Sequence, residues 1–321
     1  MRHRSSQELK MNSQTPHAPG DARTVIPAPS DHDRIMGSQQ ALTTYRFPTH
    51  RLKRTMDDPS KTPVVLVCFG SFSPITCLHL RILDMGLDYV KFNNIEFEVI
   101  GGYISPVSSA YVKPGLESKE HRSVRILGYS ICPAPLPHVC SNLEQDNMLN
   151  SSSSSNLLTD ITCRLKMCEL AIEHDTDWVM LDPWEAIQDG YTPTTEVLDH
   201  FQSCLNVETI SGSQKPITVV LLAGADLIQT MSSPDIWTAQ ELEHIFKGYL
   251  AFVVERSGTD VEDALASLKS WRERIHVIPQ LINNDVSSTK VRLSLKRRMS
   301  VRYLVPARVI AYIEEHGLYR E

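Results

Sequence analysis

Two short stretches of this sequence carry residue types that bind phosphate. The first, GSFSPITCLH, follows an apolar run and contains Gly70, Ser71, Phe72 and His79. Glycine lets the backbone approach a ligand closely, and the amides of Ser71 and Phe72 can donate hydrogen bonds. A helix that begins near Cys77 presents free amides and a favourable dipole to an anion, and His79 can add a hydrogen bond or positive charge. By its chemistry alone the stretch fits a plain strand-to-helix turn equally well, because it is neither a Walker loop nor a GxGxxG motif.

The second stretch, NDVSSTKVR, lies far along the chain at residues 284–292. Hydroxyls and free amides at a helix N-terminus bind phosphate oxygens, and so does a guanidinium. An ordinary helix N-cap followed by a solvated basic face explains the same residues, and this second interpretation is favoured when the stretch is taken alone. The residues concerned are Ser287, Ser288, Thr289, Lys290 and Arg292.

The elements that must position these stretches alternate along the chain from residue 63 onward. Apolar runs predict strands at 64–69, 95–102, 178–182, 217–226, 249–256 and 275–281, and helices are predicted at 78–90 and 305–319. Strands interleaved with helices require a mostly parallel sheet covered on both faces, so the predicted fold class is α/β, doubly wound and Rossmann-like. Ligands bind such sheets at the carboxyl ends of the strands, which is where GSFSPIT lies.

Composition narrows the class of protein. The chain has 321 residues, 41% of them hydrophobic and 22% charged, which suits a folded protein with a sizeable core. The net charge of −6 argues against a protein that coats nucleic acid, and no apolar run approaches the roughly 18 residues of a membrane span. The 7 cysteines form no CxxC pair and no zinc-type cluster, which indicates a reducing compartment. We therefore expect no nucleic-acid partner and no membrane, and a location in the nucleus or cytoplasm rather than the mitochondrion.

The N-terminal part differs from the rest in composition. Residues 1–60 are predicted to be a disordered tail, because their first 45 residues are rich in Ser, Pro, Gln, His and Arg and offer little apolar surface. Within them, YRFPTHRLKR at 45–54 is basic and aromatic, and it can dock on the domain or serve as a nuclear-import signal. Residues 61–321 are predicted to form the folded domain.

Taken together, the two phosphate-type stretches resemble the paired signature of the nucleotidyltransferase superfamily, (H/T)xGH with ISSTxxR. GGYISPV, AYVKPGL, DPWE, LLAGADL, IW and VRYLVPARVIAYIEEHGLY extend the resemblance, in order, to eukaryotic and especially fungal nicotinamide/nicotinic acid mononucleotide adenylyltransferases. The resemblance covers about residues 60–122 and 165–319. Cys77-Leu78 departs from the superfamily pattern, which has x-Gly there, and Ser73 stands where animal members have Asn.

The resemblance implies a reaction and its partners. ATP and nicotinamide mononucleotide, or nicotinic acid mononucleotide, would give NAD or deamido-NAD and pyrophosphate. The phosphate of the mononucleotide would attack the α-phosphorus in line, with the enzyme positioning the groups and neutralising charge. The implied cofactor is Mg²⁺, held mainly through ATP phosphates and water, and relatives are commonly homo-oligomers.

The resemblance also assigns residues by position. Catalysis falls to His79 and Arg292. The ATP phosphates would be held by Gly70, Ser71, Phe72, His79, Lys113, Ser287, Ser288, Thr289, Lys290 and Arg292. The mononucleotide or NAD would be held by Ser71, Phe72, Trp184, Gly224, Asp226, Trp237, Arg256 and Asn284. Ordinary roles stand beside some of these assignments: Trp184 and Trp237 as core residues, Asp226 as a helix cap and Lys113 as a solvated lysine.

Residues 123–164 interrupt the family pattern with CPAPLPHVC and a serine run. Without them the chain reads KEHR-LKMCELAIEHD, a continuous amphipathic helix. We interpret the segment as a disordered insertion and as a retained intron translated in frame; the alternative is a lineage-specific loop. Two other functions stay open: a catalytically impaired nucleotide-binding or chaperone-like protein, and a nucleotidyltransferase with a different substrate, such as a pantetheine-phosphate or cytidylyl enzyme.

Overall fold

The computed structural model describes residues 45–93, 96–109, 161–208, 215–255 and 261–320. Lys113 and Arg256, two of the predicted site residues, lie outside these ranges. Residues 1–44 of the predicted tail and 123–160 of the predicted insertion also lie outside them. Residues 161–164, the last four of that insertion, are described and form the first turn of a helix.

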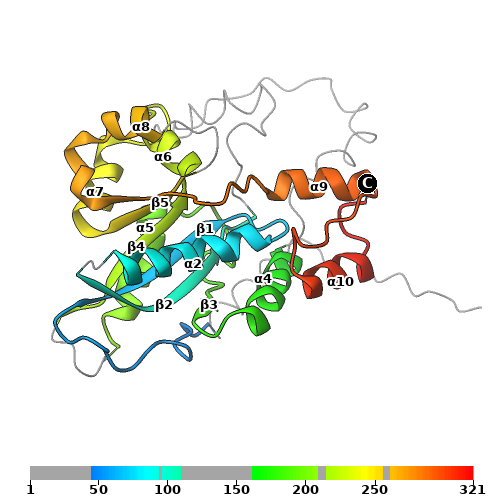
Figure 1. Cartoon of the computed structure of the whole chain (residues 1–321), viewed down its shortest axis with the longest axis horizontal. Helices are drawn as coiled ribbons and strands as arrows, with labels where there is room; N and C mark the ends of the chain where they lie inside the picture. The colour runs from blue at the N-terminus through cyan, green and yellow to red at the C-terminus, as the bar shows by residue number, and fades with distance from the viewer. Residues whose placement is uncertain (1–44, 94–95, 110–160, 209–214, 256–260, 321) are drawn as a thin grey trace, which may run out of the picture.

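One parallel sheet organises the described chain, and its strand order is β3-β2-β1-β4-β5-β6 (Figure 1). Parallel pairing of every neighbouring strand confirms the predicted doubly wound α/β fold. The order reverses between β1 and β4, where Cys68 pairs with Leu222. Gly70 and Gly224, each two residues further on, therefore end neighbouring strands at the switch point. The strands are β1 (Thr62–Gly70), β2 (Phe97–Pro106), β3 (Val179–Leu181), β4 (Thr218–Gly224), β5 (Leu250–Val254) and β6 (Ile275–Ile278).

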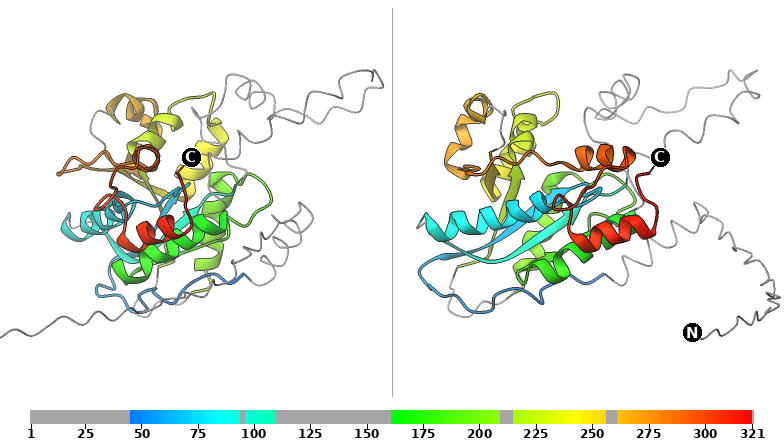
Figure 2. Two further views of the ribbon diagram at one scale, coloured as in Figure 1. Left: turned by 90° about the vertical axis from the view of Figure 1, so that its right-hand side faces the viewer. Right: turned by 45° about the vertical axis from the view of Figure 1, so that its right-hand side comes forward.

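Helices cover both faces because alternate residues of each strand point to opposite sides. Val64 and Leu66 of β1 face a core shared with four helices, and Val65 and Val67 face a second core shared with four others. The first set is α2 (Cys77–Phe92), α4 (Ile161–Asp175), α9 (Ser288–Lys296) and α10 (Ala307–Glu315), with α10 packed beside α4 (Figure 2). The second set is α5 (Thr194–Leu205), α6 (Ala225–Met231), α7 (Ala239–Gly248) and α8 (Val261–Ser267), followed by a 3₁₀ turn at Lys269–Arg274.

Residues 45–56, which we call the N-terminal strap, dock on the domain before β1 begins. Leu52 and Met56 are buried in the second core, although we predicted from the sequence that this segment belongs to a disordered tail at residues 1–60. Gly101 of β2 makes room for the strap, since a Cβ there would lie 2.6 Å from Leu52 Cδ2. Docking, one of the two alternatives for YRFPTHRLKR, is therefore what the structure shows, and the packed chain extends back to Tyr45.

Within the described ranges, no helix combines the length and the apolarity that crossing a membrane requires.

Candidate nucleotide-binding site

The turn after β1 is built around Phe72. Its φ of 44° lies in the left-handed region, which lets the chain reverse sharply between β1 and α2. Its buried ring covers Gly70, where a Cβ would lie 3.1 Å from Phe72 Cζ. From the sequence we expected a glycine at position 70 because it lets the backbone approach a ligand closely. The structure gives a second reason for glycine there, since the Phe72 ring occupies the space that a side chain would need.

Three donors from helices far along the chain hold the carbonyl oxygens of this turn. Arg164 of α4 donates to the Ser71 carbonyl oxygen at 2.9 Å, and Arg292 of α9 donates to that of Ser73 at 2.7 Å. Ser288 Oγ donates to the Pro74 carbonyl oxygen at 2.8 Å. Because the C=O and N–H of a trans peptide point opposite ways, holding the Ser71 carbonyl turns the Phe72 amide away from Arg164. The two phosphate-type stretches of the sequence thus meet in space.

His79 is fixed at the start of α2 by the residue that precedes the helix. The backbone amide of Thr76 donates to His79 Nδ1 at 2.9 Å, and Thr76 Oγ1 lies 2.9 Å from the same nitrogen. An acceptor Nδ1 carries no hydrogen, so the neutral ring carries its proton on Nε2 and presents that N–H as a donor. The Phe72 ring packs edge-on against the imidazole, with centroids 5.1 Å apart. One helix-start amide is already used, since Cys77 N donates to the Leu304 carbonyl oxygen at 2.9 Å.

The second stretch, residues 284–292, begins α9 with an ordinary helix N-cap, which is one of the two interpretations of its sequence. Ser287 is the N-cap, and its side chain accepts a hydrogen bond from the Lys290 amide at 3.2 Å. Lys290 pairs with Asp285, and both side chains are exposed. Thr289 Oγ1 accepts from Arg292 at 3.4 Å. Arg292 is half-buried beside the turn, and this burial lowers the pKa of its guanidinium.

The end of β4 contributes the next group of predicted residues. Gly224 precedes α6, and apart from its chain neighbours no atom of the described residues lies within 4 Å of the position that a Cβ would take. Asp226 is exposed in the first turn of α6. Asn284 Oδ1 accepts from the Val286 amide at 3.0 Å, which shapes the loop that leads to Ser287.

The two predicted ring-stacking tryptophans are half-buried and pack against the same core, on the face covered by α5–α8. Trp184 stacks on His200 with centroids 4.0 Å apart and an interplanar angle of 6°. Trp237 donates from Nε1 to Thr230 Oγ1 at 3.2 Å. Each indole is therefore held by a protein contact and remains half-buried.

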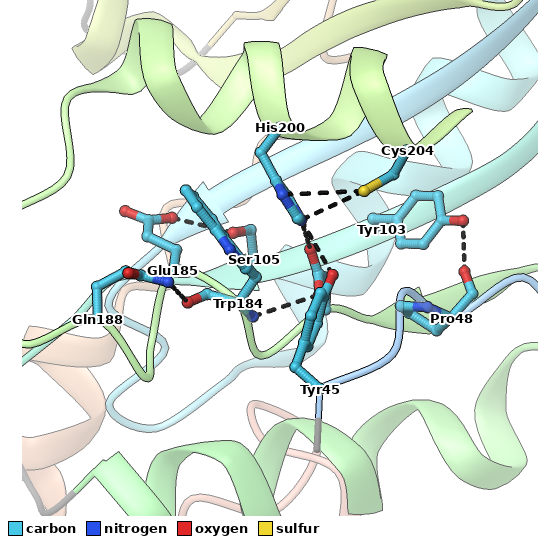
Figure 3. Close-up of polar contacts among 10 residues, drawn as sticks. Tyr45, Pro48, Tyr103, Ser105, Trp184, Glu185, Gln188, His200 and Cys204 are labelled. Carbon is cyan, nitrogen blue, oxygen red and sulfur yellow. Dashed lines mark hydrogen bonds and ion pairs between the residues drawn. The ribbon is translucent and has the colours of Figure 1, made fainter. Parts of the chain in front are cut away.

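Sequence reasoning missed several polar residues around Trp184, which Figure 3 shows. Ser105 Oγ donates to Glu185 Oε2 at 2.9 Å, and burial raises the pKa of Glu185 to about 8. Asp182 and His200 lie next to each other, 3.2 Å apart. The motif DPWE contains Asp182 and Glu185, so its two acidic residues are a sequence signal for this polar cluster.

Among the described residues, no group of three or more His, Cys, Asp or Glu side chains is placed to hold a metal ion. The side chains that meet at the turn are hydroxyls, an imidazole and guanidinium groups, a set suited to phosphate oxygens.

An open parallel sheet with the strand order β3-β2-β1-β4-β5-β6, and with donors suited to phosphate at the turn after β1, is typical of nucleotide-binding α/β proteins. The family model described as cytidylyltransferase-like matches residues 145–294. Nicotinamide/nicotinic acid mononucleotide adenylyltransferase 1 of Saccharomyces cerevisiae is 41% identical over 293 residues, which cover 89% of this chain and 62% of that protein. The Schizosaccharomyces pombe relative of the same name is 40% identical over 295 residues, covering 89% and 68%. The chain belongs to the nicotinamide/nicotinic acid mononucleotide adenylyltransferase family, as the motifs predicted.

The length of the relatives and a solved structure limit how far this assignment extends. The chain spans less than two thirds of the length of the Saccharomyces cerevisiae relative. A solved structure, Plasmodium falciparum nicotinic acid mononucleotide adenylyltransferase complexed with APC, superposes with a TM-score of 0.51 at 16% identity, covering 80% of this chain and 96% of that one. At that identity the likeness supports the fold.

Proposed function

We propose that this chain transfers the adenylyl group of ATP to nicotinamide mononucleotide and to nicotinic acid mononucleotide, with release of pyrophosphate. The observation that carries the proposal is the meeting of His79, Arg292 and Ser288 around one turn at the carboxyl end of β1. Membership of the family supports the choice of substrates.

The residues at the turn suit an in-line displacement. A phosphate oxygen of the mononucleotide forms a bond to the α-phosphorus of ATP, and the bond from that phosphorus to the bridging oxygen breaks, so pyrophosphate leaves. The attacking phosphate is already ionised at neutral pH, so no general base is needed. The N–H on His79 Nε2 and the charge of Arg292 would stabilise the negative charge that builds on the phosphates. The Phe72 amide would add a donor from the backbone.

We propose Mg²⁺ as the cation. When bound with ATP it would neutralise phosphate charge and help the pyrophosphate leave. The triphosphate of ATP supports this choice, because Mg²⁺ in proteins is commonly held through substrate phosphates and water.

Two alternative functions are compatible with this fold. The cytidylyltransferase-like match leaves room for a nucleotidyltransferase with another substrate. A nucleotide-binding protein that lacks turnover would keep the same fold. The contacts of His79 and Arg292 at one turn favour an enzyme over a binding protein without turnover. The two half-buried tryptophans, Trp184 and Trp237, favour a pyridine mononucleotide over another acceptor, because each can stack on a planar ring.

The decisive test is product formation by the full chain with Mg²⁺, ATP and either mononucleotide, run beside pantetheine phosphate and CTP-dependent acceptors. We expect NAD and deamido-NAD, each with one pyrophosphate.

His79→Ala should remove most turnover, and Arg292→Ala should weaken the use of ATP more than binding of the mononucleotide. Near-normal turnover by a folded His79→Ala protein would contradict the phosphate role, and product from another acceptor alone would contradict the substrate choice.

We also propose that the chain forms a homo-oligomer. Leu281 and Ile282 support it, because they are 93% and 82% exposed, which is unusual for adjacent large apolar residues. Light scattering of the purified chain tests this, and a monomer at micromolar concentration would contradict it.

A further inference from the structure

Trp184 is held at three points by its own domain. Its backbone amide donates to Asp182 Oδ1 at 3.3 Å, and its carbonyl oxygen accepts from Gln188 Nε2 at 2.8 Å. Its indole stacks on the His200 imidazole, with centroids 4.0 Å apart and an interplanar angle of 6°. Main chain and ring are therefore fixed independently, from the loop after β3 and from α5 (Figure 3).

His200 is itself fixed by a closed set of polar contacts. His200 Nε2 lies 3.2 Å from Asp182 Oδ2 and 3.0 Å from the Tyr45 hydroxyl, which donates to Asp182 Oδ1 at 2.9 Å. The carboxylate accepts only, and the single hydroxyl proton of Tyr45 is directed to it, so His200 Nε2 must carry the hydrogen in this arrangement. The side chains of Asp182 and His200 are only 1% and 11% exposed, which keeps water from competing for these bonds.

Tyr45 reaches this cluster because the N-terminal strap is tied to the sheet. Tyr103 of β2 donates from its hydroxyl to the Pro48 carbonyl oxygen at 2.7 Å. Phe47 lies against both Tyr103 and His200, with centroids 5.1 Å and 5.9 Å apart. The strap thus places one hydroxyl against Asp182 and His200 from outside the strand-and-helix core.

We propose that Tyr45, Asp182 and His200 are positioning residues that hold the Trp184 indole for the pyridine ring of the mononucleotide, an inference that rests on the function proposed above. With His200 against one face, a planar ligand can stack only on the opposite face of the indole. Fixing the indole in advance lowers the ordering cost of binding, so the cluster sets the affinity for the mononucleotide and leaves the ATP phosphates to the turn at His79.

The test compares His200→Asn and Tyr45→Phe with the wild-type full chain. The matched control is His244→Asn, because His244 also bonds to an aspartate, Asp199 at 2.9 Å, but on the exposed surface. We expect His200→Asn to raise the KM for nicotinamide mononucleotide about 3- to 10-fold, the range that loss of one aromatic contact gives, with less than about twofold change in the KM for ATP. Tyr45→Phe should shift the same ratio in the same direction by a smaller factor, and the control should leave it unchanged.

A spectroscopic measurement keeps the test independent of turnover. The emission of Trp184 is obtained as the difference between each protein and its Trp184→Phe counterpart, and it should increase in His200→Asn because the stacked imidazole no longer quenches it. An unchanged KM for the mononucleotide in folded His200→Asn would overturn the proposal, as would equal increases in the KM for both substrates. Absence of turnover by the wild-type chain would instead overturn the proposed function, and the positioning role with it.

Discussion

Glu185 is a buried carboxyl that follows Trp184 directly. Burial is the main cause that raises its pKa from the ordinary 4.5 to about 8; the hydrogen bond from Ser105 opposes the shift, and the charge of Asp182 adds to it. In the folded protein this carboxyl therefore keeps a proton that the unfolded chain has already released near neutral pH. Its contribution to stability is fully present below the unfolded pKa and is lost as pH rises through the folded one.

Replacing Glu185 with Gln tests this linkage, since the amide keeps the shape and the polar group but cannot ionise. We expect the free energy of unfolding of the wild type to fall relative to Glu185→Gln between about pH 5 and about pH 8, by up to roughly 4 kcal/mol. Urea denaturation of both proteins across this range measures the difference. Parallel curves would mean that the carboxyl ionises in the folded protein as it does in water.

At the level of elements, the N-terminal strap joins α4 to the sheet through one side chain. Arg51 donates to the carbonyl oxygens of Ile172, Thr176 and Val179 at 3.0, 2.9 and 2.7 Å. Carbonyls at the end of a helix lack partners within that helix, so the guanidinium completes the end of α4 and links it to β3. The strap is therefore part of the folded domain.

Arg51→Met removes these bonds while keeping much of the side-chain volume. We expect the free energy of unfolding to fall by about 2–4 kcal/mol, because several carbonyls lose a charged donor in a partly buried place. Chemical denaturation gives the value, and Arg46→Ala is the matched control because Arg46 is an exposed arginine of the same strap. A loss below about 0.5 kcal/mol, the size typical of a surface change, would show that water replaces the arginine.

Most of the strands were predictable because they contain a local apolar run, such as 64–69 of β1 or 250–254 of β5, which is what burial on both faces of a sheet requires. Arg51 and Tyr45 were not, because their partners are backbone carbonyls and a carboxylate more than a hundred residues away. The same distinction applies at the site. The family resemblance implied that Ser288 and Arg292 bind phosphate, which stays a prediction, and nothing in the sequence indicated that they also hold the carbonyls of the 70–76 turn.

At the scale of the whole molecule, Arg164 links the predicted insertion to the site. It is the last residue of the 123–164 segment, yet it is buried in α4 and donates to the Ser71 carbonyl oxygen. Joining Arg122 directly to Leu165 would again place an arginine before LKMCEL, with KEHR in the positions that ITCR now takes. The sequence without the segment therefore supplies the same donor at the same helical position, as the retained-intron interpretation requires.

Deletion of residues 123–164 should thus give a protein that folds and makes NAD at least as fast as the full chain. The control is the same deletion with Arg122→Met, which removes the restored donor and should cost about 1.5–3 kcal/mol of stability and most of the turnover. Thermal unfolding and product formation are measured on all three proteins. Activity of the full chain and of the deletion alike would make the segment a tolerated insertion, and a deletion protein that does not fold would show that the segment belongs to the domain. Sequencing spliced transcripts across the junction decides its origin, since a uniform mature message that contains the segment would contradict the intron.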